Sequence, residues 1–176
     1  MGEKYVHISK LDAAKRQLEI AIRLFLSYSD IVVIHTLTAA AYNVLRDLGK
    51  KQGIETIIKD YGLKRIREEY RKEFLNEVNK AENFFKHADR DGDKILKFPV
   101  GATEYLLWDA CVTYEKITGE KLPLIAVFNA WFIGNHPNVI IDGNYKTLVN
   151  EAMAGLDLQD RSQFLNLLPI VSKFTT

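Results

Sequence analysis

Apolar residues recur at intervals of three and four along most of the chain, which is the spacing of α-helices that cover one face of a core. Between residues 11 and 25 charged side chains alternate with the apolar positions Leu11, Ala14, Leu18, Ile22 and Phe25. Residues 27–30 break the pattern. We therefore predict a first amphipathic helix that ends before residue 27.

The next segment, residues 31–45, contains no Asp, Glu, Lys or Arg. Its β-branched start at residues 31–34 could form a strand, but the alanines at 39–41 favour a helix. A helix without charges is covered on nearly all sides. We expect this second helix to be central and to end near Gly49 and Gly53.

The rest of the chain continues the helical pattern. We predict a long amphipathic helix from Ile66 to Ala88, a helix opened by Pro99 and stopped by Gly119, a buried helix from Pro123 to Ile133, and shorter helices over residues 145–154 and 161–173. No series of alternating strands and no long linker interrupts them. The fold class is all-α: one domain over residues 1–176, a bundle of six or seven helices, with a core at about 10–135 and helices in 144–174 packed on it.

Composition and charge limit the classes of partner and the cellular location that we expect. Lys plus Arg is 24 and Asp plus Glu is 23, a net charge of +1, which argues against binding of nucleic acid or anionic lipid by bulk charge. The single cysteine, Cys111, cannot form an internal disulfide. The chain starts without a signal-peptide pattern, and polar residues interrupt the uncharged stretch at 122–141. We expect a cytoplasmic protein with no membrane span.

The most informative polar segment is residues 76–94, NEVNKAENFFKHADRDGDK. Asn79, Asn83 and His87 are four residues apart and share one helix face. Two interpretations stay open: these groups bond a neighbouring helix or the following loop, or they form one wall of a site in which His87 titrates or binds a ligand. Asp89 is a candidate partner of His87 or Arg90.

His35 lies inside the uncharged second helix. It is either a satisfied core histidine or a residue that meets His87 across two packed helices, in a site that Glu104 or Trp108 completes. The spacings that typically bind metal on helices are absent, so we predict no metal and no cofactor.

Neither the acidic loop at residues 89–93 nor the single thiol is predicted to form a calcium site or a catalytic site. Asp89, Asp91 and Asp93 match the start of a calcium loop, but its sixth and twelfth positions are Lys94 and Val100 instead of Gly and Glu. Phosphate-binding glycine loops, nucleophile elbows and CxxC pairs are missing from the sequence. Cys111 lies on a mostly apolar face, where an inert buried thiol is expected.

The strings IHTLTAAAY and NFFKHADRD, at residues 34–42 and 83–91, resemble those of a widespread family of uncharacterised bacterial helical proteins. The resemblance covers about residues 11–133 and implies a bacterial cytoplasmic protein. Its signatures supply His35, Thr36, Asn83, Lys86, His87 and Asp89.

More distantly, ENFFKH resembles the Arg-polar-x-x-x-His motif of HEPN domains, helical modules of toxin–antitoxin and phage-defence systems, many of which are dimeric ribonucleases. Asn83 and His87 match the motif, but Glu82 stands where the motif has Arg. A carboxylate there would repel the charge that develops at a phosphate, which puts ribonuclease activity in doubt.

These observations predict a non-enzymatic binding module, with homodimer formation expected. Its ligand-binding residues would be His35, Asn83, His87, Asp89 and Glu104, and its partner a protein or a small ligand. The alternative is a HEPN-like ribonuclease or a metal-dependent hydrolase with His87, Asn83 and His35 as catalytic candidates. Nucleic acid is a partner only under that alternative.

Overall fold

The computed structural model describes residues 4–89, 92–141 and 143–173. All regular elements in these ranges are helices, so the all-α prediction is confirmed. In chain order they are α1 (Lys10–Leu26), α2 (Ile31–Lys50), η1 (Ile57–Gly62), α3 (Glu68–Lys86), α4 (Ala102–Thr118), α5 (Pro123–Asn135), α6 (Asn144–Ala152), α7 (Arg161–Leu165) and α8 (Leu168–Val171).

The described ranges hold eight α-helices, one more than the upper bound of the sequence prediction. The difference lies at the end of the chain, where the helix predicted over residues 161–173 is divided into α7 and α8. Pro169 is the second residue of α8. Because proline has no backbone N–H and is favoured in the first turn of a helix, it starts a new helix instead of continuing α7.

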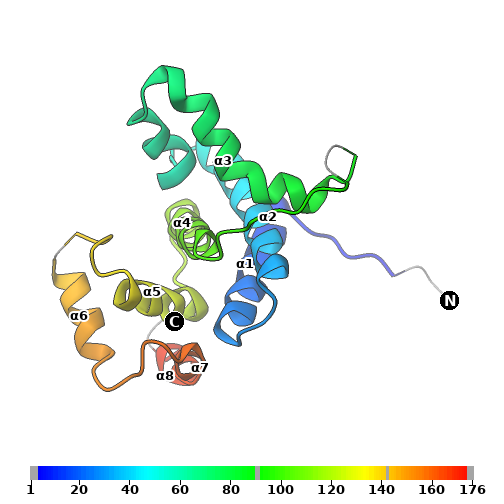
Figure 1. The fold of residues 1–176 in the computed structure, drawn as a ribbon. Helices are drawn as coiled ribbons and strands as arrows, with labels where there is room; N and C mark the ends of the chain where they lie inside the picture. Colours follow the sequence, from blue (N-terminus) through cyan, green and yellow to red (C-terminus); the bar gives the residue numbers. More distant parts are fainter. Residues whose placement is uncertain (1–3, 90–91, 142, 174–176) are drawn as a thin grey trace.

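The helices α1 and α2 form an antiparallel pair against which α4 packs, and α5 contacts both α1 and α4 (Figure 1). The helices α6, α7 and α8 contact α5. Side chains from five of these helices meet in one core, whose largest fully buried members include Phe25, Tyr42, Tyr114, Phe128 and Phe164. Thr103, Leu107, Ala110 and Tyr114 of α4 are buried, and Ile117 of the same apolar row is half-buried.

The first two helices begin at side-chain caps. The Ser9 hydroxyl accepts a hydrogen bond from the Asp12 N–H, and the Asp12 carboxylate accepts one from the Ser9 N–H. Asp30 accepts hydrogen bonds from the N–H groups of Val32 and Val33. These caps satisfy donors that lack a partner in the first turn of a helix. The Asp30 cap starts α2 directly after the break at residues 27–30 that the sequence pattern indicates.

A π-helix, η1, follows α2 where the sequence pattern predicts no element. Its first turn is capped from α4: the Asp109 carboxylate accepts hydrogen bonds from the N–H groups of Ile57 at 2.9 Å and Ile58 at 2.8 Å. The Tyr42 hydroxyl donates to the same carboxylate at 3.0 Å. Asp109 is fully buried, and burial raises the pKa of its carboxyl against the effect of these donors.

A second carboxylate, Asp60, holds η1 to α2. Arg46 donates to Asp60 from two nitrogens, at 2.9 Å and 2.7 Å, and the Thr56 hydroxyl donates at 2.7 Å. Burial alone would raise the pKa of Asp60, but the hydrogen bonds from Arg46 and Thr56 outweigh it and hold the pKa at about 2. Such a bidentate pair fixes geometry as well as charge.

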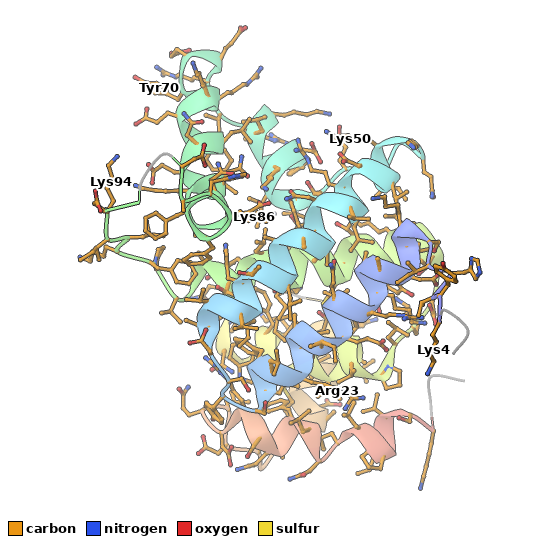
Figure 2. All side chains as sticks on the ribbon, turned by 90° about the vertical axis from the view of Figure 1, so that its right-hand side faces the viewer. Lys4, Arg23, Lys50, Tyr70, Lys86 and Lys94 are labelled. Carbon is orange, nitrogen blue, oxygen red and sulfur yellow. The ribbon has the colours of Figure 1, made fainter. Side chains whose placement is uncertain are left out.

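The helix α3 is less deeply buried than its periodicity predicts. Of its residues only Ala81 and Glu82 are buried, and Tyr70, in the predicted inward row, is 54% exposed. Figure 2 shows Tyr70 at the far end of α3, away from the α1–α2 pair, with Lys94 on the loop that follows the other end of the helix. The space between α3 and α4 is therefore incompletely filled.

None of the helices in the described ranges is both long enough and apolar enough to cross a bilayer.

Gly119 ends α4 in the left-handed conformation, with φ at 70°, as the stop signal in the sequence predicts. A Cβ at this position would contact nothing within 4 Å, so the effect of Gly119→Ala comes from backbone strain alone. We expect a loss of about 1 kcal/mol in the free energy of unfolding, measured in urea. The matched control is Gly101→Ala, whose φ of −60° suits alanine and whose Cβ also contacts nothing. Gly101→Ala should leave stability unchanged or slightly raised, and equal losses for the two variants would contradict the prediction.

Candidate functional site

His35 is a buried histidine of α2 and is 3% exposed. Its Nδ1 lies 3.1 Å from the Thr103 hydroxyl of α4. The rings of Phe85 and Phe98 meet it edge-on, with centroids at 5.8 Å and 5.0 Å. Burial lowers the pKa of His35 to about 4, against a smaller opposite effect of Glu82, so the imidazole is neutral at pH 7.

A cavity of about 460 Å³ lies beside His35, between α3, α4 and the loop that joins them; we call it the His35 cavity. Its lining is mainly apolar and includes Ile58, Val78, Ala81, Leu96, Phe98 and Leu106. The charged lining residues Glu77, Lys80 and Lys97 are exposed and form its rim. Its size is typical of sites for small molecules.

One polar atom beside the cavity is unsatisfied. The Nε2 of His35 is buried and has no hydrogen-bond partner among the described residues. Buried ring nitrogens normally have one. Only one of the two ring nitrogens of His35 therefore has a hydrogen-bond partner. The interpretation of His35 as a satisfied core histidine explains Nδ1 but does not explain Nε2.

Asn83 and His87 lie elsewhere, at the end of α3. Both are exposed, and with Asn76 and Phe84 they line a separate hollow of about 370 Å³, the His87 hollow. The backbone N–H of His87 donates to the Asn83 carbonyl at 3.1 Å and closes the helix. The two cavities share Lys80 and Leu96 in their linings, but His35 lines the first and His87 the second.

Glu82 occupies the position at which HEPN domains carry Arg, and its role here is structural. It accepts hydrogen bonds from Lys86 at 2.5 Å and from Asn43 at 2.6 Å, and the buried Lys59 ammonium is 3.7 Å away. Burial alone would raise the pKa of Glu82, but these partners outweigh it and lower the pKa. Glu82 is an acid and cannot supply the cation that the motif has at this position, and the ribonuclease alternative stays a prediction.

Glu104 is in a third place, on the opposite side of α4 from the His35 cavity. It accepts a hydrogen bond from His136 Nε2 at 2.9 Å, and His136 Nδ1 lies 3.2 Å from the Tyr105 hydroxyl. No sequence pattern points to His136, because it stands in a turn-forming stretch, GNHPN, without helical periodicity. Its distance of 32 residues from Glu104 gives no signal of their contact.

Asp89 is exposed in the turn after α3, and Asp91 of the rejected calcium loop lies outside the described residues. In the part of the chain that the structure describes, no three His, Cys, Asp or Glu side chains are grouped so that they could hold a metal ion. Cys111 is fully buried, and burial raises the pKa of its thiol well above the usual value, which makes the thiol a poor nucleophile.

The predicted site residues thus fall into three locations: His35 with Thr103, Asn83 with His87, and Glu104 with His136. Comparison with protein-family models, with curated proteins and with solved structures finds no match to this chain. The family resemblance, the homodimer and the cytoplasmic location stay predictions. Of the three locations, the His35 cavity combines a mainly apolar lining with a histidine that has an unsatisfied buried nitrogen.

Proposed function

We propose that the chain is a non-enzymatic binding protein whose His35 cavity takes a small, mainly apolar molecule with one hydrogen-bond-accepting oxygen. The observation that carries the proposal is the buried Nε2 of His35, which lacks a partner among the described residues. A buried polar group left unpaired is destabilising by about 1–3 kcal/mol. A ligand that supplies the partner removes that penalty.

The Thr103 hydroxyl decides which kind of atom the ligand offers. Thr103 is fully buried, and its hydroxyl lies 3.1 Å from His35 Nδ1, a contact in which either group can donate; we assign the hydroxyl as the donor. A neutral imidazole carries its proton on one nitrogen only, so an acceptor Nδ1 leaves an N–H at Nε2. The matching ligand group is therefore an acceptor oxygen, such as that of a ketone, an ester or a carboxylic acid.

The rest of the lining sets the character of the ligand. Phe98 and Leu106 present apolar surface, and the charged side chains stand at the rim in contact with water. Burial of apolar ligand surface supplies the affinity, while the single N–H orients the molecule. A volume of about 460 Å³ has room for a ligand of one or two rings or a short acyl chain.

The test is calorimetric titration with acetophenone and with ethylbenzene, which have similar shapes and differ in one carbonyl oxygen. We expect acetophenone to bind about tenfold more tightly, since one hydrogen bond to a buried group contributes about 1 kcal/mol or more. His35→Phe should abolish this preference while ethylbenzene still binds. Equal affinity of the two probes for the wild type, or a preference that survives in His35→Phe, would overturn the proposal.

Two further variants test whether the probes bind in the His35 cavity or elsewhere on the surface. Ala102 is exposed and lines the cavity, so Ala102→Phe should block both probes without disturbing the core. Ile141→Ser changes a 91% exposed apolar residue outside the cavity lining and should affect neither probe. Unchanged binding in Ala102→Phe would place the probes elsewhere and contradict the assignment.

A further inference from the structure

Glu104, Trp131, His136 and Arg161 surround a second cavity of about 380 Å³, which we call the Arg161 cavity. They come from α4, α5, the turn after α5 and the start of α7. Two of these residues have opposite charges and lie side by side: Arg161 Nη2 donates to Glu104 Oε1 at 3.3 Å. The other oxygen of Glu104 accepts from His136.

Aromatic rings hold the guanidinium of Arg161 in place. Its central carbon lies 4.0 Å from the ring centroid of Phe25, 5.2 Å from that of Trp131 and 5.4 Å from that of Tyr28. Cation–π contacts of this kind position a guanidinium while its N–H edges stay able to bond. The backbone is fixed as well, because the Arg161 N–H donates to the Tyr28 hydroxyl at 2.7 Å. Contacts of the side chain and of the backbone thus both hold Arg161 at this position.

Trp131 also has a buried polar atom that lacks a hydrogen-bond partner among the described residues. Its side chain lines the Arg161 cavity and is 3% exposed, and its indole Nε1 is buried without a hydrogen-bond partner among the described residues. An indole N–H can only donate. Trp131 therefore has one unsatisfied donor, and the guanidinium that lines the same cavity has five N–H groups and uses one on Glu104.

We propose that the Arg161 cavity binds a small zwitterion of the α-amino acid class. Its carboxylate would bond to the Arg161 guanidinium and the Trp131 N–H, and its ammonium would bond to Glu104. A molecule with a carboxylate alone would face the negative charge of Glu104, and an amine alone would leave the donors of Arg161 and Trp131 unsatisfied. Only a ligand with both charges close together matches both members of the pair.

The experiment uses three probes with a shared carbon chain: norvaline, pentanoate, which lacks the amine, and butylamine, which lacks the carboxylate. The chain has two tryptophans, so the indole region of a ¹H–¹⁵N spectrum carries two signals, which Trp108→Phe assigns. Norvaline should shift the Trp131 signal saturably, with a Kd about tenfold or more below that of either other probe. The Trp108 signal is the internal control, since its side chain does not line the Arg161 cavity.

Variants test the recognition of the carboxylate and the recognition of the ammonium separately. Arg161→Gln should abolish saturable binding of norvaline, whereas Arg23→Gln, a substitution on the exposed face of α1 (Figure 2), should leave it unchanged. Glu104→Gln should bring the Kd of norvaline to that of pentanoate. Trp131→Phe keeps the aromatic ring and removes the N–H, and calorimetry should then show at least about fivefold weaker binding.

Several outcomes would overturn the proposal. They are the absence of a saturable Trp131 shift with millimolar norvaline, equal Kd values for norvaline and pentanoate in the wild type, and full binding in Arg161→Gln. If Arg161→Gln fails to fold, the affinities of Trp131→Phe and Glu104→Gln decide in its place, and wild-type values in both would refute the site. None of these results bears on the acetophenone test of the His35 cavity, so the two proposals stand or fall separately.

Discussion

Lowering the pH from 6.5 to 4 is expected to reduce the free energy of unfolding by about 3 kcal/mol through His35 alone. The folded-state pKa of His35 is about 4, lowered from 6.5 mainly by burial. Each unit of difference between the folded and unfolded pKa values corresponds to about 1.4 kcal/mol. This is among the largest effects that we expect for a single group in the chain.

The sign follows from which state binds the proton first. Below pH 6.5 the unfolded chain protonates His35, while the folded chain resists protonation until the pH reaches about 4. The unfolded state therefore holds more protons in this window, and stability falls as the pH falls. The contribution of His35 is fully present above pH 6.5. Asp60, with its pKa of about 2, acts in the same direction but only below pH 3.8.

The measurement is urea unfolding of the wild type and of His35→Phe at intervals between pH 7 and pH 4. The difference between the two proteins isolates His35, because all other titrating groups are common to both. His7→Phe is the matched control, since His7 is exposed in the segment before α1. A pH dependence that is the same in His35→Phe and the wild type would contradict the prediction.

Asp109→Asn is expected to destabilise the fold by about 3 kcal/mol, since it breaks a buried charge-assisted cap. Both oxygens of Asp109 accept from backbone N–H groups of η1, and the second also accepts from Tyr42. Asparagine has the same shape but replaces one oxygen with an NH₂ group. A donor then faces a donor at a fully buried position.

Urea unfolding again measures the loss, with Asp47→Asn on the exposed face of α2 as the control. That control should change stability by less than about 0.5 kcal/mol. Hydrogen exchange adds a local test, because the amides of Ile57 and Ile58 should lose protection in Asp109→Asn before the rest of the core does. If the two Asp→Asn variants lose the same small amount of stability, the cap at η1 does not have the assigned role.

Three consecutive residues at the start of α4 connect the two proposed sites. Thr103 bonds to His35, Glu104 binds Arg161 and His136, and Tyr105 lines the His35 cavity while its hydroxyl contacts His136. Successive helical positions are about 100° apart, so neighbouring residues point to different sides of the same helix. One turn of α4 thus serves both cavities.

The candidate residues themselves were partly predictable. His35 stands out as a lone imidazole in an uncharged helix, and Glu104 as an acid in the first turn of a predicted helix. What the sequence could not predict is their partners, because Thr103 is 68 residues from His35 and His136 is 32 residues from Glu104. Contacts over such separations have no periodic signature. Lys59 was missed for the same reason, since its burial against Glu82 depends on η1, an element without a recognisable pattern.

The sequence alone determined the helices, because an apolar stripe of period 3.6 and local caps act within a few residues of each other. The breaks at residues 27–30 and at Gly119, and the buried helix α5, follow from such local features. Tertiary structure alone decided that α3 would pack against α2 and leave the His35 cavity between α3 and α4, that Asp109 would cap η1, and that His35 and His87 would line different cavities. Those outcomes depend on how distant surfaces fit together, which the spacing of residues along the chain does not record.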